Sequence, residues 1–89
     1  MTQIAAHFGM ALRDLRVRHG WSQEMLAAQA NLNRSYIGEL ERGESQASLA
    51  TVAKLAAALG LRMSELLVHT ECIAQSRSSR SAQLMPIAG

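Results

Sequence analysis

Side chains able to carry out chemistry are few in this chain, and their spacing does not bring them together. Glu39 and Glu41 lie two positions apart, which places them on different sides of a helix and not in an acid–base pair. His7 and His19 have no cysteine, aspartate or second histidine at the spacing of metal ligands, so we interpret both as surface residues. The sequence therefore predicts neither an enzyme nor a metal or cofactor site.

A different chemistry, hydrogen bonding from one exposed face, is available within residues 34–42. Ile37 and Leu40 have the spacing of inward-facing residues on a short helix, with Tyr36 at the boundary. The remaining face is polar or small and carries Arg34, Ser35, Gly38, Glu39 and Arg42. Such a face needs a helix that is held at a fixed angle.

The stretch Trp21–Gly43, WSQEMLAAQANLNRSYIGELERG, provides this support as two short helices joined by a turn. Ser22 and Asn33 are favourable N-cap residues, because their side chains accept a hydrogen bond from an unpaired backbone N–H. Asn31 falls at the turn and tolerates the left-handed backbone conformation. Two helices are therefore expected to meet at a fixed angle.

The composition favours an all-α fold. Hydrophobic residues make up 48% of the 89 positions and aromatic residues only 3%, so the core must be built from aliphatic side chains at helical spacing. We predict a compact five-helix bundle, with helices over about 4–18, 23–30, 34–41 and 49–59 and a short fifth helix capped by Ser64. The buried stripes are predicted to contain Ile4, Phe8, Ala11, Leu12 and Leu15 in the first helix, and Leu49, Val52, Leu55, Ala56 and Leu59 in the fourth.

The character of the chain changes after about Thr70. The segment AQSRSSRSAQ is rich in Ser and Arg and has no apolar stripe, and LMPIAG follows it. We predict a domain over residues 1–70 and a flexible C-terminal tail over residues 71–89. The tail is either solvated or docks on a protein partner.

Three further features narrow the cellular setting. A formal net charge of +2 permits a nucleic-acid partner without indicating one. The single cysteine, Cys72, excludes an internal disulfide and is typical of a reducing compartment. No apolar run approaches the roughly 20 residues that span a membrane. We therefore expect a cytoplasmic protein with no membrane partner.

Residues from about Leu12 to Leu67 resemble the helix-turn-helix domain of phage repressor and Cro-like transcription regulators. The resemblance rests on LRDLRVRHGWSQEMLAAQANLNRSYIGELERGE followed by SLATVAKLAAALGLRMSELL. It is greatest to the controller proteins of restriction–modification systems and similar small stand-alone regulators. Asn31 stands where the family most often has glycine.

The resemblance implies that the third helix contacts bases in the major groove of DNA, and a helix about 10–12 Å across fits a groove about 12 Å wide. Arg34 is the first candidate, because a guanidinium can bond guanine O6 and N7 together. Ser35 can bond a neighbouring base, and Gly38 leaves space for a thymine methyl group. Glu39 has two interpretations: it accepts from cytosine N4, or it pairs with Arg42 within the helix.

Other residues are implied to hold the helix on the DNA backbone, namely Gln23, Asn33, Tyr36 and Arg42. Gln23 matches a family glutamine that bonds a phosphate at a helix N-terminus. Tyr36 either contacts the backbone or packs as a half-buried side chain. Arg16 and Glu41 match a pair that typically forms a salt bridge between the first and third helices, an architectural role.

A single copy carries few cations near this face, so one copy is expected to bind DNA weakly. The family typically dimerises through its C-terminal helix, which here carries Met63, Leu66, Leu67 and Val68, although any of these can instead belong to the core. Two recognition helices about 34–36 Å apart reach successive major grooves. The leading hypothesis is a homodimeric, sequence-specific transcription regulator that binds an inverted-repeat operator in double-stranded DNA. The alternative is an antitoxin-like interaction protein whose tail binds a protein partner.

Overall fold

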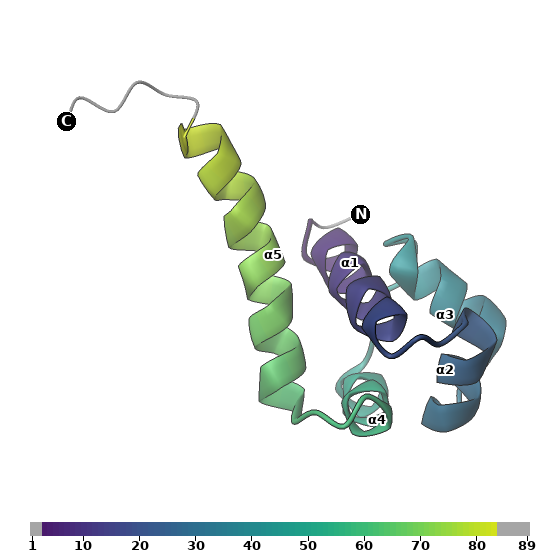
Figure 1. Ribbon diagram of the computed structural model, residues 1–89. Coiled ribbons are helices and arrows are strands. Elements are labelled where there is room, and N and C mark those ends of the chain that lie inside the picture. The colour runs from purple at the N-terminus through teal and green to yellow at the C-terminus, as the bar shows by residue number, and fades with distance from the viewer. Residues whose placement is uncertain (1–2, 84–89) are drawn as a thin grey trace.

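The computed structural model describes residues 3–83, with side chains over residues 3–77, and consists of helices joined by short loops (Figure 1). In chain order the helices are α1 (Gln3–Arg18), α2 (Gln23–Ala30), α3 (Arg34–Glu41), α4 (Leu49–Ala58) and α5 (Met63–Gln83). The predicted all-α, five-helix fold is confirmed. The segment LMPIAG, considered above as a docking segment, lies outside the described residues.

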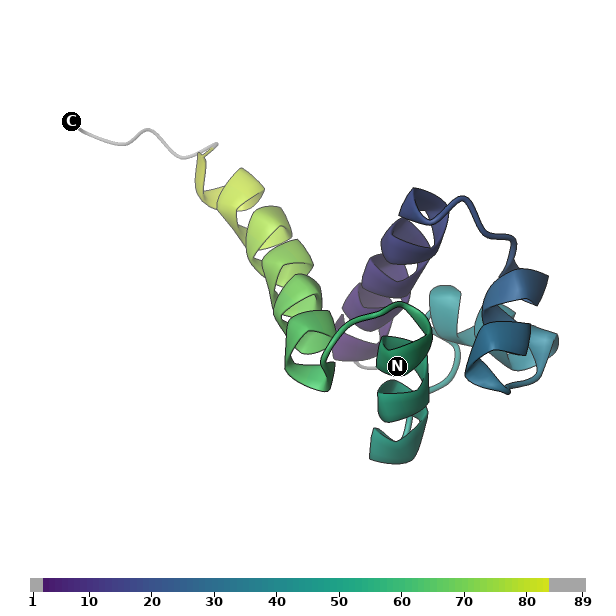
Figure 2. The same ribbon diagram turned by 60° about the horizontal axis from the view of Figure 1, so that its bottom comes forward.

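Helix α1 lies between α5 on one side and the α2–α3 pair on the other, as both ribbon views show (Figures 1 and 2). Helix α4 completes the bundle by packing against α2 and α5. The centre of the core contains six large aliphatic side chains with no exposed surface, namely Leu12, Leu26, Ile37, Leu40, Leu55 and Leu66. Because α3 meets α1 and α2 through its inner face, its outer face is left to solvent.

The apolar stripes of α1 and α4 are correct except at the first turn of each helix. Phe8 and Leu12 of α1 and Leu55 of α4 are buried as predicted. Ile4 and Leu49, by contrast, are 63% and 76% exposed, so their assignment to the core is wrong. Both lie too close to the start of a helix for the neighbouring helices to cover them.

Helix α5 is longer than the short helix that the sequence predicts. It begins at Met63, and the backbone N–H of Arg62 donates to Glu65 Oε1 over 2.7 Å, a cap of a different kind from the one expected at Ser64. The helix continues through the predicted boundary at residue 70 to Gln83, so residues 71–83 are helical, and the flexible tail expected over residues 71–89 stays a prediction. Residues 71–83 include neither Gly nor Pro, so nothing in them stops the helix.

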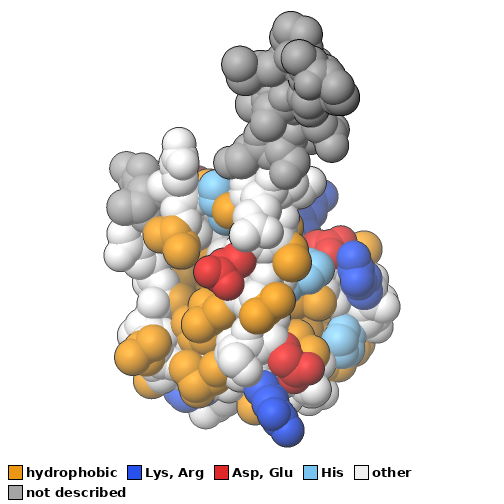
Figure 3. Space-filling view, turned by 90° about the vertical axis from the view of Figure 1, so that its left-hand side faces the viewer, with side chains coloured by type: hydrophobic (Ala, Val, Ile, Leu, Met, Phe, Trp, Pro, Cys, Tyr) orange, Lys and Arg blue, Asp and Glu red, His pale blue; other side chains and the backbone are white. Residues whose placement is uncertain are grey.

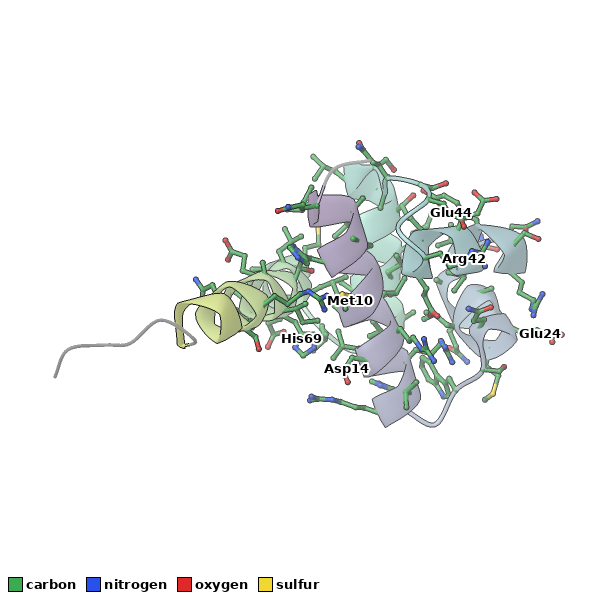
Figure 4. All side chains as sticks on the ribbon, turned by 90° about the horizontal axis from the view of Figure 1, so that it is seen from above. Met10, Asp14, Glu24, Arg42, Glu44 and His69 are labelled. Atoms are coloured by element: carbon green, nitrogen blue, oxygen red, sulfur yellow. The ribbon has the colours of Figure 1, made fainter. Side chains whose placement is uncertain are left out.

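Polar contacts between α1 and α5 accompany their packing. His69 Nε2 lies 2.9 Å from Asp14 Oδ2, and Arg18 lies 3.0 Å from the same carboxylate oxygen. Further along α5, Arg77 Nη1 donates to Met10 Sδ over 3.6 Å. Seen from above in Figure 4, Asp14 and His69 lie together at the α1–α5 boundary. The sequence reading gave no role to His69.

The close approach of α1 to α3 depends on Gly9, which is buried at their crossing. A Cβ atom added to Gly9 would overlap the backbone oxygen of Leu40 and would lie 2.7 Å from that of Glu41. Backbone atoms cannot move aside as the end of a flexible side chain can. Only glycine therefore permits this spacing between the two helices.

We expect Gly9→Ala to lower the free energy of unfolding by about 1–3 kcal/mol, because overpacking outweighs the gain of about 1 kcal/mol in helix propensity. Chemical denaturation monitored by circular dichroism measures this change. Arg13→Ala, at an exposed position of the same helix, should shift stability by less than about 0.5 kcal/mol. An equally stable or more stable Gly9→Ala protein would contradict the close approach.

Candidate functional site

Local hydrogen bonds fix the start of α2, the start of α3 and the turn between the two helices. Ser22 Oγ accepts from the Met25 N–H over 3.1 Å, and Asn33 Oδ1 accepts from the Ser35 N–H over 2.7 Å. Asn31 ends α2 in the left-handed conformation, with φ 57° and ψ 48°. Both predicted caps and the predicted left-handed asparagine are thus present, and α3 begins directly after the second cap.

The inner sides of α2 and α3 hold the angle between the helices. Leu26, Ala27 and Ala30 of α2 are buried against Ile37 and Leu40 of α3. The outer face of α3 is consequently presented by a rigid pair of helices.

Arg34 and Ser35 are exposed at the start of that outer face. Gly38, one turn later, is buried, and an added Cβ would lie 3.0 Å from Arg42 Nη1 and 3.6 Å from Gln23 Oε1. The resemblance assigns the space beside Gly38 to a thymine methyl group. In the structure this space is bordered by the side chains of Arg42 and of Gln23, which belongs to α2.

Glu39 does not pair with Arg42, contrary to one of the two interpretations of the sequence. Instead Glu39 Oε1 accepts from Ser45 Oγ over 2.8 Å, and Ser45 belongs to the loop after α3. The carboxylate is half-buried and has a neutral hydroxyl as its bonded neighbour. The other interpretation, acceptance from a base, remains a prediction.

Arg42 pairs with Glu44, a partner that the sequence reading missed. Nε donates to Glu44 Oε2 over 2.9 Å and Nη2 to Glu44 Oε1 over 3.1 Å, with more than half of each side chain exposed. The hydrogen bond raises the pKa of Arg42 and lowers the pKa of Glu44. The signal in the sequence was Gly43, which has φ 73° and turns the chain back so that residues two apart meet.

Tyr36 contacts the same loop, because its hydroxyl donates to the backbone oxygen of Gln46 over 3.3 Å. The side chain is half-buried and packs against the core. This agrees with the interpretation of Tyr36 as a packing residue. Contact of Tyr36 with the DNA backbone stays a prediction.

Beneath the outer face, one carboxylate joins three helices. Glu41 of α3 is 3% exposed and accepts from Arg16 Nε over 2.6 Å and from Arg16 Nη2 over 3.0 Å. Gln23 Nε2 of α2 donates to Glu41 Oε1 over 3.0 Å, and Arg16 Nη1 also donates to the backbone oxygen of Trp21 over 2.7 Å. The ion pair expected between Arg16 and Glu41 is present, and bonding to Glu41 raises the pKa of Arg16. Gln23, proposed for phosphate, already donates within the protein.

The predicted self-association residues of α5 separate into two groups. Leu66 is fully buried in the core of the single chain, so its assignment to a dimer interface is corrected, and Met63 is half-buried against the same core. Leu67 and Val68 are 39% and 53% exposed. Successive residues of a helix point about 100° apart, which explains why these four diverge.

Leu67 borders an apolar groove of about 210 Å³ between the starts of α1 and α4 and the side of α5. The groove is also lined by Ile4 and Leu49, the two residues that the sequence wrongly placed in the core. Figure 3, which views the α5 side, shows hydrophobic side chains gathered beside this helix. The loop between α3 and α4 also lines the groove, through Ser45, Gln46 and Ala47.

Comparisons with known proteins identify the family. A helix-turn-helix family model matches residues 12–66, more than half of the chain. The chain belongs to the helix-turn-helix family of DNA-binding transcription regulators. In this family α2 and α3 are the two helices of the name, and the resemblance drawn from the sequence is confirmed.

Restriction–modification controller proteins are among its relatives. The control protein C.MunI of a Mycoplasma species is 39% identical over 72 residues, covering 80% of this chain and 97% of the relative. The crystal structure of the controller protein C.AhdI from Aeromonas hydrophila has 45% identity and a TM-score of 0.71, covering 73% of this chain and 98% of that one. A hypothetical transcription factor of Neisseria meningitidis is 44% identical over 57 residues, and the chain spans 54% of its length.

Membrane-spanning helices and groups of metal ligands were searched for among the described residues. Among residues 3–83 no helix is long and apolar enough to cross a membrane. Within the same part of the chain no group of three or more potential metal ligands occurs, while Cys72 is an exposed free thiol.

We expect Arg16→Ala to destabilise this helix-turn-helix protein by about 3–5 kcal/mol, because it leaves the buried Glu41 carboxylate without its cation. Thermal and denaturant unfolding measure the loss. The matched control is Arg18→Ala on the same helix, whose pair with Asp14 is mostly exposed and contributes at most about 1 kcal/mol. Equal effects of the two substitutions would show that the Arg16–Glu41 pair is not architectural.

Proposed function

We propose that this protein is a sequence-specific transcription regulator that binds an inverted-repeat operator in double-stranded DNA as a homodimer. The observation that carries the proposal is the exposed start of α3, where Arg34 and Ser35 project from a helix fixed by two caps and a buried core. A helix about 10–12 Å across fits the major groove. Such a protein would act in the cytoplasm, on the nucleoid.

Base contact is assigned to the outer face of α3. The guanidinium of Arg34 supplies the two parallel donors that guanine O6 and N7 accept. Ser35 lies beside it and can donate or accept. The Glu39 carboxylate, bonded to Ser45 and not to a cation, keeps acceptor capacity for cytosine N4, and Gly38 allows the DNA to approach.

Contact with the DNA backbone is assigned to four residues, Gln23, Asn33, Tyr36 and Arg42. Gln23 and Asn33 lie at the starts of α2 and α3, where the partial positive charge of a helix N-terminus favours phosphate. All except Arg42 are neutral, so one copy neutralises few phosphates and binds weakly.

Dimerisation is supported by the exposed apolar surface around the groove beside α5. Leu67, Ile4 and Leu49 are exposed and line the groove, Val68 is exposed next to Leu67 in the chain, and burial of one such side chain contributes about 1.5–3 kcal/mol. A second copy placed there leaves both α3 helices free. A structural relative of the same fold, the controller protein C.Esp1396I (21% identity, TM-score 0.71, 84% of this chain and 95% of that one), is a tetramer in complex with its natural 35 base-pair operator.

The alternative, an interaction protein whose C-terminal tail binds a partner, gains no support from residues 71–83. These residues continue α5, and Arg77 bonds to Met10 of its own chain. A pull-down comparing the full chain with a chain ending at residue 70 tests this alternative directly.

Selection of binding sites from random DNA by the purified full chain tests the proposed function. An enriched inverted repeat is the expected result, and its half-site spacing should correspond to about one helical turn or a multiple of it. Recovery of unrelated sequences without a shared motif would overturn sequence-specific binding.

We expect Arg34→Ala to weaken binding to the selected operator by about 5- to 150-fold, the equivalent of about 1–3 kcal/mol for a bidentate base contact. Binding to scrambled DNA should weaken far less. Titrations by fluorescence anisotropy at fixed salt measure both. The control is Arg13→Ala, which removes an exposed arginine from α1. Equal losses on operator and scrambled DNA would mean that Arg34 contacts phosphate and not a base.

We expect Leu67→Ser to raise the dissociation constant of self-association by about tenfold, because it removes an apolar side chain from the proposed interface. Sedimentation equilibrium measures the constant. Val17→Ser changes an exposed apolar residue of α1 that does not line the groove, and it should leave the constant unchanged. Identical behaviour of the two variants would place the interface elsewhere.

A further inference from the structure

The loop after α3 turns back along the helix and bonds to it at three consecutive residues. In chain order, these contacts join Glu44 to Arg42, Ser45 to Glu39, and the backbone oxygen of Gln46 to Tyr36. Tyr36 and Glu39 of α3 and Arg42, the residue that caps its C-terminal end, all belong to the face that we assign to DNA. The loop therefore determines which groups of this face are available to a ligand.

The contact with Glu44 uses the same donors that a phosphate would use. Arg42 directs Nε and Nη2 at two oxygens of one carboxylate, over 2.9 and 3.1 Å. A phosphate group presents two oxygens to the same fork of a guanidinium. Glu44 and a DNA phosphate consequently compete for the same donors. Arg42 cannot make its two-point hydrogen bond to both of them at once.

The competition matters because this face has few cations. Arg34 is the other arginine exposed on α3, and the cation of Arg16 is consumed by the buried Glu41. Figure 4 shows Arg42 and Glu44 next to each other on the α3 side, well away from Asp14 and His69. Whether Arg42 is free or paired thus changes a large part of the positive charge near bound DNA.

We propose that Glu44 limits the affinity of this protein for DNA by holding the Arg42 guanidinium in the free protein, so that a phosphate must displace a carboxylate to reach it. This inference rests on the proposed DNA-binding function and adds to it an intramolecular competitor for the backbone. The pair is exposed on both sides, so it exchanges readily and reduces affinity without blocking it.

The competition has a defined size and a defined salt signature. An exposed pair is weak because water and salt screen it, so freeing Arg42 strengthens binding by only up to about fivefold. The gain is independent of DNA sequence, because the contact is to phosphate. Salt screens the Arg42–Glu44 pair and so eases its displacement, and removing the pair therefore steepens the dependence of log K on log salt concentration, by at most about 0.9 for the one phosphate contact involved.

The experiment is a double-mutant cycle with Glu44→Gln, Arg42→Gln and the protein carrying both. Binding to the selected operator and to scrambled DNA is measured by anisotropy at several salt concentrations. We expect Glu44→Gln alone to bind both DNAs about two- to fivefold more tightly, with the steeper salt dependence. In the Arg42→Gln background the same change should have a smaller effect and no steepening. Glu71→Gln removes one exposed carboxylate from α5 and is the matched control for charge.

Two outcomes overturn the proposal. An equal gain from Glu44→Gln in both backgrounds would show that Glu44 acts as a general negative charge and not through Arg42. No gain in either background would show that the pair does not compete with DNA. Both differ from failure of the proposed function, in which the unmodified protein selects no sequence from random DNA. Circular dichroism of each variant verifies that the exposed substitutions leave the fold intact.

Discussion

The carboxylate of Glu41 is the feature on which the rest of the structure depends. It is almost completely buried, and its oxygens accept three hydrogen bonds from the side chains of Arg16 on α1 and Gln23 on α2. A buried charge without such partners costs several kcal/mol, whereas here the cation is supplied with two-point geometry. Because Glu41 is the last residue of α3, the same bonds fix the end of α3 against both of its neighbours.

Close contact between α1 and α3 makes this ion pair possible. Gly9 lets the backbone of α1 approach the carbonyl oxygens at the end of α3, and Arg16 reaches Glu41 from two turns further along α1. The two contacts support each other, since the glycine sets the distance between the helices and the arginine sets their register. The family resemblance predicted the charged pair from the sequence. The role of Gly9 could not be predicted, because the sequence does not show which helix packs against a glycine inside α1.

Local signals predicted local structure well in this chain. The N-caps at Ser22 and Asn33 and the left-handed Asn31 depend on side chains bonding to the nearest backbone, so a short stretch of sequence was sufficient to find them. Burial at the first turns of α1 and α4 depends on which helix lies opposite, and periodicity carries no such information. Ile4 and Leu49 were misplaced for that reason, and together they reveal the groove. Periodicity underestimates the length of α5, because the second half of this helix has no apolar stripe. A helix anchored by Leu66 and Thr70 continues until a residue stops it.

The arrangement also separates two kinds of surface. The outer face of α3 is polar, and its charged side chains are bonded to the loop that follows, whereas the groove beside α5 is apolar and is lined by α1, α4, α5 and part of the same loop. Contact with phosphates and burial of apolar area have opposite chemical requirements, and the proposed function assigns each to the surface whose chemistry suits it. The ion pair of Arg42 with Glu44 is placed at the first surface, where bonds are exposed and exchange, while that of Arg16 with Glu41 lies in the interior, where bonds persist. Two arginine–glutamate pairs with the same two-point hydrogen bonding thus differ in burial, in further bonded partners and in the elements that they join.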